Sequence, residues 1–424
     1  MFILEQTEIL PDGGLKLDPR LCVLCRGGRY LCGYAFCPIV VKSIARRRHV
    51  GVWRRRELHG SSPPTVFVGR AGYPVVAAGP AVPPVRGDTR EYDLPEAWRN
   101  TPLEKILDYR LSLVLGRSFL RVDSVNSKAV RGLQELALSL KPVEVELVLE
   151  KPPRPVVLLD DHAPPMGPAA PLRHFRLVGN VSPERIVERV YSDTDLKSSE
   201  AVYALYESGI PVTHIQRLLS VGCLGVGRLR RLVPTRWSIT AVDDMISRRL
   251  VERIKGYETI DKVQVFVRKS AKNLFVAILA PRTWSFEWME AWFPKSTWNP
   301  SEDETVVEGD YEEYWGRSRY AAIGGCYYAA RLATVEYLNR IRRQATAILL
   351  REIYPGFTIP IGVWFVRENL REMFSTKPVE FDELKDALRY VSGFTKLDIS
   401  VWISSSRLIR RLAGQRKITS WMDA

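Results

Sequence analysis

The stretch Val263-Gln-Val-Phe-Val-Arg-Lys-Ser-Ala-Lys-Asn-Leu-Phe-Val-Ala-Ile-Leu279 contains two apolar runs on either side of a polar turn. Both runs are rich in β-branched and aromatic residues, which favour strands. Two such runs joined by a short polar segment are typical of a β-hairpin. We therefore predict an antiparallel pair of strands at residues 263–268 and 274–279.

Segments outside this hairpin predict a mixture of strands and helices. Residues 143–149, Val-Glu-Val-Glu-Leu-Val-Leu, alternate apolar and polar side chains as a half-buried strand does. Residues 103–115 carry apolar side chains at helical spacing, and residues 198–209 form a helical pattern that ends at a glycine. The expected fold class is therefore α+β or mixed α/β.

Three further expectations concern the second half of the chain. Trp284, Trp288 and Trp292 lie four residues apart, which predicts one face of a helix. The apolar spacing over residues 334–352 predicts a single long amphipathic helix. The acidic run over residues 302–313 predicts a solvated loop.

The length, composition and net charge of the chain indicate the class of protein and the kind of partner that it binds. The chain has 424 residues, of which 46% are hydrophobic and 26% charged, so we expect two or three globular domains. Its net charge of +14 favours a polyanionic partner, either nucleic acid or an anionic surface. The sequence contains no apolar run long enough to span a membrane and no signal peptide. These features predict a cytoplasmic protein.

Four of the six cysteines form a cluster with the spacing C-x2-C-x6-C-x4-C. The cluster consists of Cys22, Cys25, Cys32 and Cys37. Four thiolates complete the tetrahedral shell of a structural Zn²⁺, and a module this small depends on its metal to fold. An iron–sulfur cluster and unmetallated cysteines remain alternatives, whereas a reducing compartment disfavours disulfides. We expect zinc.

Two arginine-rich stretches are candidates for contact with a nucleic-acid backbone. The first follows the cysteine cluster and the second precedes an acidic pair. Phosphate contacts by such residues give affinity without sequence choice, although a solvated basic helix face has the same composition. The candidate residues are Arg46, Arg47, Arg48, Arg54, Arg55 and Arg56, followed by Arg228, Arg230, Arg231 and Arg236.

Two pairs of aspartates are the candidates for catalysis. Asp160 and Asp161 follow an apolar stretch, a position that is used both to hold Mg²⁺ and to form a turn. Asp243 and Asp244 follow Thr240, and Thr240 with Asp243 is typical of the start of a helix. The sequence has no phosphate-binding loop and no His-Glu-x-x-His motif. A metal-dependent nuclease or other DNA-processing enzyme that uses these carboxylates is therefore the alternative function.

The last residues of the chain combine a glutamine with apolar anchors at fixed spacing. Gln415 is followed by Ile418, Trp421 and Met422. In a 3₁₀ turn, residues three apart lie on one face, so Ile418 and Trp421 would point the same way. This pattern resembles the PCNA-interacting peptide that docks on the DNA sliding clamp, with Met422 in place of the usual second aromatic residue. A terminal turn that packs on its own domain is the alternative.

The chain as a whole resembles the archaeal Nre family. The resemblance is carried by the cysteine cluster, the terminal peptide, and the stretches Val233-Pro-Thr-Arg-Trp-Ser-Ile-Thr-Ala-Val-Asp-Asp244 and Gly362-Val-Trp-Phe-Val-Arg-Glu-Asn369. It implies DNA-damage repair, a C4 metal site at Cys22, Cys25, Cys32 and Cys37, and PCNA sliding-clamp binding through residues 415–422. It implies no catalytic residues for the central region.

The expected organisation has four parts. They are a C4 metal module with a basic flank at residues 1–60, a Pro/Gly-rich mixed β domain at 61–190, a helix-rich α/β core at 191–400, and a basic linker with a flexible clamp-binding tail at 401–424. The leading hypothesis is a nucleoid-associated repair factor that binds DNA and is tethered to the sliding clamp. An RNA-binding zinc protein is a third possibility, which the tail disfavours.

Overall fold

The computed structural model describes residues 17–29, 31–32, 37, 39–40, 55–153, 160–179 and 181–414. The chain forms two compact units that are discontinuous in sequence. The first unit comprises Met1–Ile39, Ser247–Ile359 and Val366–Ala424, and the second comprises Val40–Ile246 and Pro360–Phe365. The described residues contain two mixed six-stranded sheets and separate helices, so the expected α+β class is confirmed.

The sheet of the first unit has the order β10-β9-β11-β8-β7-β12, in which β9 and β11 are parallel and all other neighbours are antiparallel. Its strands are β7 (Val263–Ser270), β8 (Asn273–Ala280), β9 (Ser285–Trp292), β10 (Val306–Glu312), β11 (Thr346–Ile353) and β12 (Val379–Phe381). The predicted hairpin is thus present as β7 and β8. Ala271 and Lys272 close it with φ of 43° and 60°, as a two-residue hairpin turn requires.

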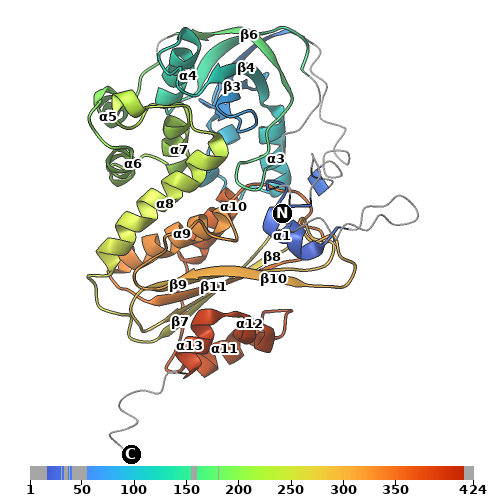
Figure 1. The fold of residues 1–424 in the computed structure, drawn as a ribbon, viewed down its shortest axis with the longest axis vertical. Helices are drawn as coiled ribbons and strands as arrows, with labels where there is room; N and C mark the ends of the chain where they lie inside the picture. The colour runs from blue at the N-terminus through green and yellow to red at the C-terminus, as the bar shows by residue number, and fades with distance from the viewer. Residues whose placement is uncertain are drawn as a thin grey trace, which may run out of the picture. The chain divides into compact units, whose positions relative to one another are not determined.

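Helices cover both faces of this sheet, and β8, β9 and β11 are consequently buried along their whole length (Figure 1). Helix α9 (Gly325–Ile341) packs against β9 on one face, together with α10 (Trp364–Met373). The other face carries α11 (Leu384–Ser392), α12 (Ile399–Ser405) and α13 (Arg407–Gly414), whose Trp402, Leu408 and Ile409 enter the core.

Two of the expected helices are wrong in this unit. Trp288 and Trp292 lie on β9, with Trp284 just before it, because a spacing of four is also even and places side chains on one face of a strand. Residues 334–352 are not one helix: α9 ends at Ile341, Arg342 adopts φ of 55°, and β11 follows. The acidic run is also more ordered than expected, since part of it forms β10.

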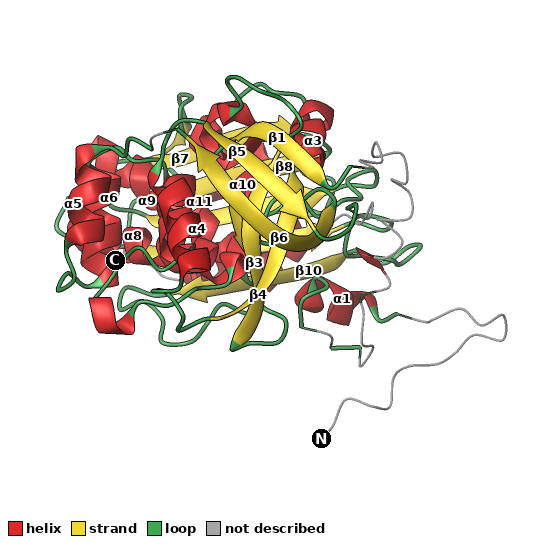
Figure 2. Ribbon diagram, turned by 90° about the horizontal axis from the view of Figure 1, so that it is seen from above, coloured by secondary structure: helices red, strands yellow, loops and turns green. Residues whose placement is uncertain are grey.

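The sheet of the second unit has the order β1-β5-β6-β4-β3-β2, in which β6 and β4 are parallel (Figure 2). Its strands are β1 (Glu57–Ser62), β2 (Val66–Val68), β3 (Val75–Val82), β4 (Val114–Arg121), β5 (Val143–Leu149) and β6 (Ala169–Val178). Helix α4 (Lys128–Leu138) packs on one face, where a Cβ on Gly132 would lie 2.9 Å from the ring of Phe175. The strand predicted at residues 143–149 is confirmed as β5.

The remaining helices of this unit include two that begin where the patterns over residues 103–115 and 198–209 predicted them, and one exception to the predicted starts. They are α3 (Leu103–Ser112), α5 (Arg185–Ser192), α6 (Ser198–Glu207), α7 (Val212–Ser220) and α8 (Thr235–Ile254). The exception is α8, which begins at Thr235 rather than near Thr240, because the amides of Trp237 and Ser238 already donate to the carbonyl of Pro234 at 2.7 and 3.0 Å. The helix start expected at Thr240 and Asp243 is therefore wrong. Among the described residues, no helix is both long and apolar enough to cross a bilayer.

Candidate functional site

The first half of the cysteine cluster lies on a short helix with a complete N-cap. Helix α1 (Pro19–Cys25) follows Asp18, whose carboxylate accepts hydrogen bonds from the amides of Arg20 and Leu21 at 2.8 and 3.4 Å. The helix ends where Arg26 and Gly27 adopt φ of 47° and 66°. This left-handed turn follows Cys25 directly, and its glycine adopts positive φ without a steric cost.

The four cysteines lie close enough to influence one another electrostatically. Burial, together with the negative charge of the neighbouring thiolates of Cys37, Cys25 and Cys32, raises the pKa of Cys22 to about 12. None of the four forms a disulfide. Four thiols are the donor set that a soft divalent cation takes, but the group of possible ligands within 4.8 Å of one another among the described residues does not include them.

A buried ionic network fixes this turn to the sheet of the first unit. Arg26 donates to Glu290 of β9 at 2.6 Å, and Arg351 of β11 donates to the same carboxylate at 3.0 Å. The indole nitrogens of Trp288 and Trp292 donate to it as well, at 3.2 and 3.1 Å. Burial alone would raise the pKa of Glu290, but the two guanidinium groups outweigh it and hold that pKa below its usual value.

Glu290 and Arg26 were not among the residues predicted from the sequence. Their partnership joins positions that lie 264 residues apart, and no local pattern signals it. The sequence signal that could have indicated an ionic partner was the charged residue Glu290 between Trp288 and Trp292. A buried strand tolerates a carboxylate only when it is paired.

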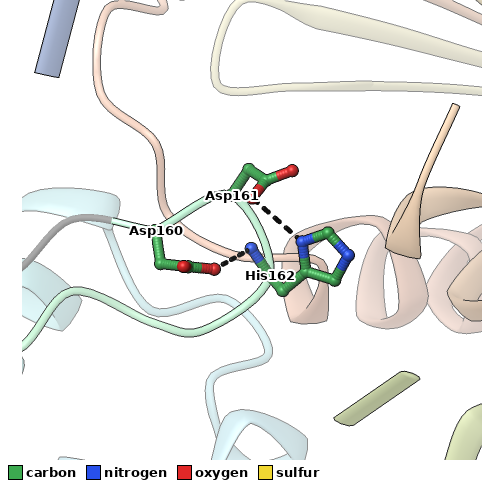
Figure 3. A group of neighbouring side chains, drawn as sticks. All are labelled: Asp160, Asp161 and His162. Carbon is green, nitrogen blue, oxygen red and sulfur yellow. Dashed lines mark hydrogen bonds and ion pairs between the residues drawn. The ribbon is translucent and has the colours of Figure 1, made fainter. Parts of the chain in front are cut away.

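In the second unit, Asp160, Asp161 and His162 form the group of possible metal ligands found among the described residues. One ligand atom from each lies within 4.8 Å of the others (Figure 3). The Oδ1 atom of Asp160 accepts hydrogen bonds from the amides of His162 and Ala163 at 2.8 and 3.2 Å. Asp161 Oδ1 lies 2.9 Å from Nδ1 of the buried His162. The Asp160 contacts are those of an Asx turn.

Arg236 already supplies the counter-charge for this pair of carboxylates. Its Nη1 atom lies 3.0 Å from both oxygens of Asp160 and also bonds Asp161. Burial would lower the pKa of Arg236, but Asp161 and Asp160 outweigh it and raise that pKa above its usual value. A divalent cation at this position would have to displace the guanidinium group, so the geometry favours a structural ion pair.

Residues 360–365 complete this cluster from a distant part of the sequence. Gly362 has φ of 91°, and a Cβ there would lie 2.7 Å from the carbonyl carbon of Ala163. The amide of Val363 donates to the carbonyl of His162 at 3.0 Å. The cluster of Asp160, Asp161, His162, Arg236 and Gly362 therefore joins the two long stretches that carry the family resemblance.

The second pair of aspartates does not belong to this group. Asp243 is fully buried inside α8 and accepts a hydrogen bond from Gln216 of α7 at 2.9 Å. Asp244 is partly buried on the same helix. The structure therefore places Asp243 in a contact between two helices, and the four candidate carboxylates do not converge among the described residues.

The arginine candidates divide into engaged, exposed and undescribed residues. Arg230 donates to the carbonyls of Gly225, Tyr191 and Asp193 at 2.7, 2.8 and 2.7 Å, so its charge holds a loop together. Arg236 is held by Asp160 and Asp161, as described above. Four candidates are exposed, namely Arg55, Arg56, Arg228 and Arg231. The remaining candidates lie outside the described residues; they are Arg46, Arg47, Arg48 and Arg54, together with Gln415, Ile418, Trp421 and Met422 of the tail.

Two family models match most of the chain. A model described as "Archaeal Nre, N-terminal" matches residues 31–299, and one described as "Archaeal Nre, C-terminal" matches residues 312–421. The first match begins between the two cysteine pairs, and the second extends through Trp421 of the tail. No solved structure gives a significant match.

Curated relatives are similar over nearly their whole length. DNA repair protein NreB of Archaeoglobus fulgidus is 52% identical over 400 residues, which cover 94% of this chain and 99% of the relative. DNA repair protein NreA of the same organism is 37% identical over 373 residues, covering 88% and 93%. DNA repair protein NreA of Haloferax volcanii is 34% identical over 353 residues, covering 81% and 84%.

Proposed function

The chain belongs to the archaeal Nre family, and from this membership we propose that it is a DNA repair factor that binds DNA and is held at the sliding clamp by its C-terminal peptide. The observation that carries the repair role is the similarity of the whole chain to relatives named DNA repair proteins. Similarity over nearly the whole of each chain makes a shared role more plausible than a shared module would.

The clamp-binding part of the proposal is supported by the sequence of the tail. Gln415, Ile418, Trp421 and Met422 have the spacing of a clamp-binding peptide, and the C-terminal family match runs through residue 421. A tryptophan that enters an apolar pocket commonly dominates such an interface. A clamp that encircles DNA would raise the local concentration of this protein on DNA even if each contact is weak.

Zinc is the metal that we propose for Cys22, Cys25, Cys32 and Cys37. When bound, the ion would replace the missing hydrophobic core of this small module. Metal analysis of the purified protein tests this proposal. We expect about one zinc per chain, and loss of that zinc in Cys22→Ser and Cys25→Ser. Iron with acid-labile sulfide in place of zinc would contradict it.

The DNA-binding part is supported by the charge of the chain and by four exposed arginines. The net charge is +14, and Arg55, Arg56, Arg228 and Arg231 project from the second unit without burial. Each phosphate contact releases condensed counter-ions, so the affinity should fall steeply as salt rises. A fluorescence-anisotropy titration with labelled DNA at several salt concentrations measures this dependence.

Survival after DNA damage tests the repair role itself. We expect that a strain lacking this gene is sensitive to DNA-damaging agents and that the wild-type chain restores its resistance. Trp421→Ala should restore it only in part, whereas Trp315→Ala, which changes an exposed tryptophan of the first unit, should restore it fully. Equal sensitivity of the deletion strain and its parent would overturn the proposal.

A further inference from the structure

One face of the sheet in the second unit exposes aromatic and apolar side chains. Phe119 of β4 is 78% exposed, and Val75 of β3 is 40% exposed. In the register of this antiparallel pair, Ala77 lies opposite Phe119 and Val75 lies opposite Arg121. Opposite residues and alternate residues share a face, so all four of these side chains lie on the same side of the sheet.

A second pair of exposed rings lies at the same end of these strands. Tyr73 precedes β3 by two positions and contacts Trp237 of α8, with ring centroids 5.3 Å apart. Both rings are about half exposed, at 49% and 45%. Strand β2, which precedes Tyr73, is connected to the start of α8, because the amide of Val68 donates to the hydroxyl of Thr235 at 2.9 Å.

Backbone hydrogen bonds bring the arginine-rich segment 227–231 to this end as well. The amide of Val122 donates to the carbonyl of Pro74 at 2.9 Å, and the amide of Leu232 donates to the carbonyl of Val122 at 2.8 Å. The segment that follows β4 therefore lies between the start of β3 and the residues just after Arg231. We call Tyr73, Val75, Phe119 and Trp237 the aromatic end of the sheet.

Arginines outnumber carboxylates around the aromatic end, where Arg236 is already paired with Asp160 and Asp161. Strands β3 and β4, the turn at residues 69–74 and the segment 227–237 contain arginines but no aspartate or glutamate. Asp123 follows β4 by two residues and carries a carboxylate. Its Oδ2 atom lies 2.7 Å from Nη2 of Arg121. The positive charge of Arg231 also reaches Asp123 and helps to lower the pKa of that carboxyl.

Exposed rings surrounded by guanidinium groups match the chemistry of a nucleic-acid strand. Single exposed apolar residues are ordinary on protein surfaces, but a group of them at one place marks a binding surface. Unpaired bases stack on exposed aromatic rings, while arginines contact the phosphates between them. A protein partner with an apolar face would need acidic residues around it to match the arginines.

We propose that the aromatic end of this sheet binds single-stranded DNA, with bases stacked on Phe119, Trp237 and Tyr73. Its phosphates would be held by Arg231 and by Arg117, which lies two residues before Phe119 on β4 and therefore shares its face. This proposal rests on the DNA-binding role proposed above and specifies its substrate class. Duplex DNA has its bases already stacked on one another, so it cannot use the rings. The surface therefore favours strands that are exposed at gaps, ends or unwound sites.

Anisotropy titrations of the full-length chain with labelled oligothymidylate of about 20 nucleotides test the proposal. We expect Phe119→Ala and Trp237→Ala each to raise the Kd for this strand about tenfold. Duplex binding should change by less than about twofold, because stacking does not contribute to it. Arg231→Ala should lower the slope of log Kd against log salt by about 1.

Trp315→Ala is the matched control, because Trp315 is an exposed tryptophan on the first unit. We expect it to leave the affinity for the single strand unchanged. Circular dichroism of each variant verifies that the fold is retained. An equal-length oligouridylate separates the two strand chemistries: tighter binding to it than to oligothymidylate would overturn the assignment to DNA.

Two outcomes separate this proposal from the function on which it rests. If the wild-type chain binds duplex DNA but Phe119→Ala and Trp237→Ala bind the single strand as tightly as the wild type, the stacking surface is refuted and general DNA binding stands. If the wild-type chain binds neither form of DNA, the proposed DNA-binding role fails as well, and the aromatic end is a surface for a protein partner.

Discussion

Replacement of Glu290 by glutamine tests the link between the cysteine module and the sheet of the first unit. The carboxylate of Glu290 is fully buried, and it neutralises Arg26 and Arg351, whose side chains are 3% and 4% exposed. Glu290→Gln would remove the carboxylate that both buried guanidinium groups share. Breaking a buried ion pair in this way costs about 3–5 kcal/mol. We expect a loss of that size in the free energy of unfolding.

Urea unfolding, followed by tryptophan fluorescence and circular dichroism, measures this loss. Glu302→Gln is the control, since Glu302 pairs with Lys295 on the surface and its replacement should change stability by less than about 0.5 kcal/mol. We also expect Glu290→Gln to release the proposed zinc more readily, because Arg26 follows Cys25 directly. A destabilisation below about 1 kcal/mol would refute the argument, because the buried pair would then contribute no more than an exposed one.

The pH dependence of this difference provides an independent check. The folded pKa of Glu290 is lowered from its ordinary 4.5, so its contribution to stability is fully present above pH 4.5. The contribution is lost as pH falls through the lowered folded pKa. The difference in the free energy of unfolding between the wild type and Glu290→Gln should therefore be constant above pH 4.5 and should shrink as the pH falls below 4.5.

Other predictions concern the cluster around Asp160. Gly362→Ala should lower the free energy of unfolding by about 2–4 kcal/mol, because the new Cβ meets the Ala163 backbone at positive φ, whereas Gly209→Ala has a similar φ with open space and should cost less. Mg²⁺ or Mn²⁺ should not raise the Tm or permit cleavage of gapped and flapped DNA, because Arg236 holds the position of a cation. Cleavage that disappears in Asp160→Asn would contradict this prediction and support the nuclease alternative.

Features of the fold that depend on neighbouring residues were predictable from the sequence. The prediction of the hairpin formed by β7 and β8 was correct, because both strand patterns and the polar turn lie within residues 263–280. The strand β5 followed from the alternation of apolar and polar residues over residues 143–149. The family resemblance was also confirmed, because it rests on sequence patterns that survive without any knowledge of the structure.

Features that depend on distant partners were not predictable in the same way. The spacing of Trp284, Trp288 and Trp292 fits both a helix and a strand, and only the neighbouring strands of the sheet decide between them. Asp243 has the sequence of a helix cap but bonds Gln216 of another helix.

The same limit applies to the candidate site. Arg230 and Arg236 look like phosphate ligands in the sequence, yet backbone carbonyls and carboxylates from distant segments engage them. The residues next to an arginine in the sequence do not reveal these partners, because each of the two arginines is contacted by a residue more than 30 positions away. The cysteine spacing indicated a metal site, and in the structure the other three cysteines help to raise the pKa of Cys22, but the metal itself stays a prediction.

Isothermal titration of the full-length chain against the archaeal sliding clamp tests the central claim most directly. We predict saturable binding by the wild type and by Trp315→Ala, with the affinity weakened at least tenfold in Trp421→Ala, since a buried tryptophan anchor contributes about 2 kcal/mol or more. Equal affinity of the wild type and Trp421→Ala, or no binding by the wild type, would contradict the claim that residues 415–422 hold this repair protein at the clamp.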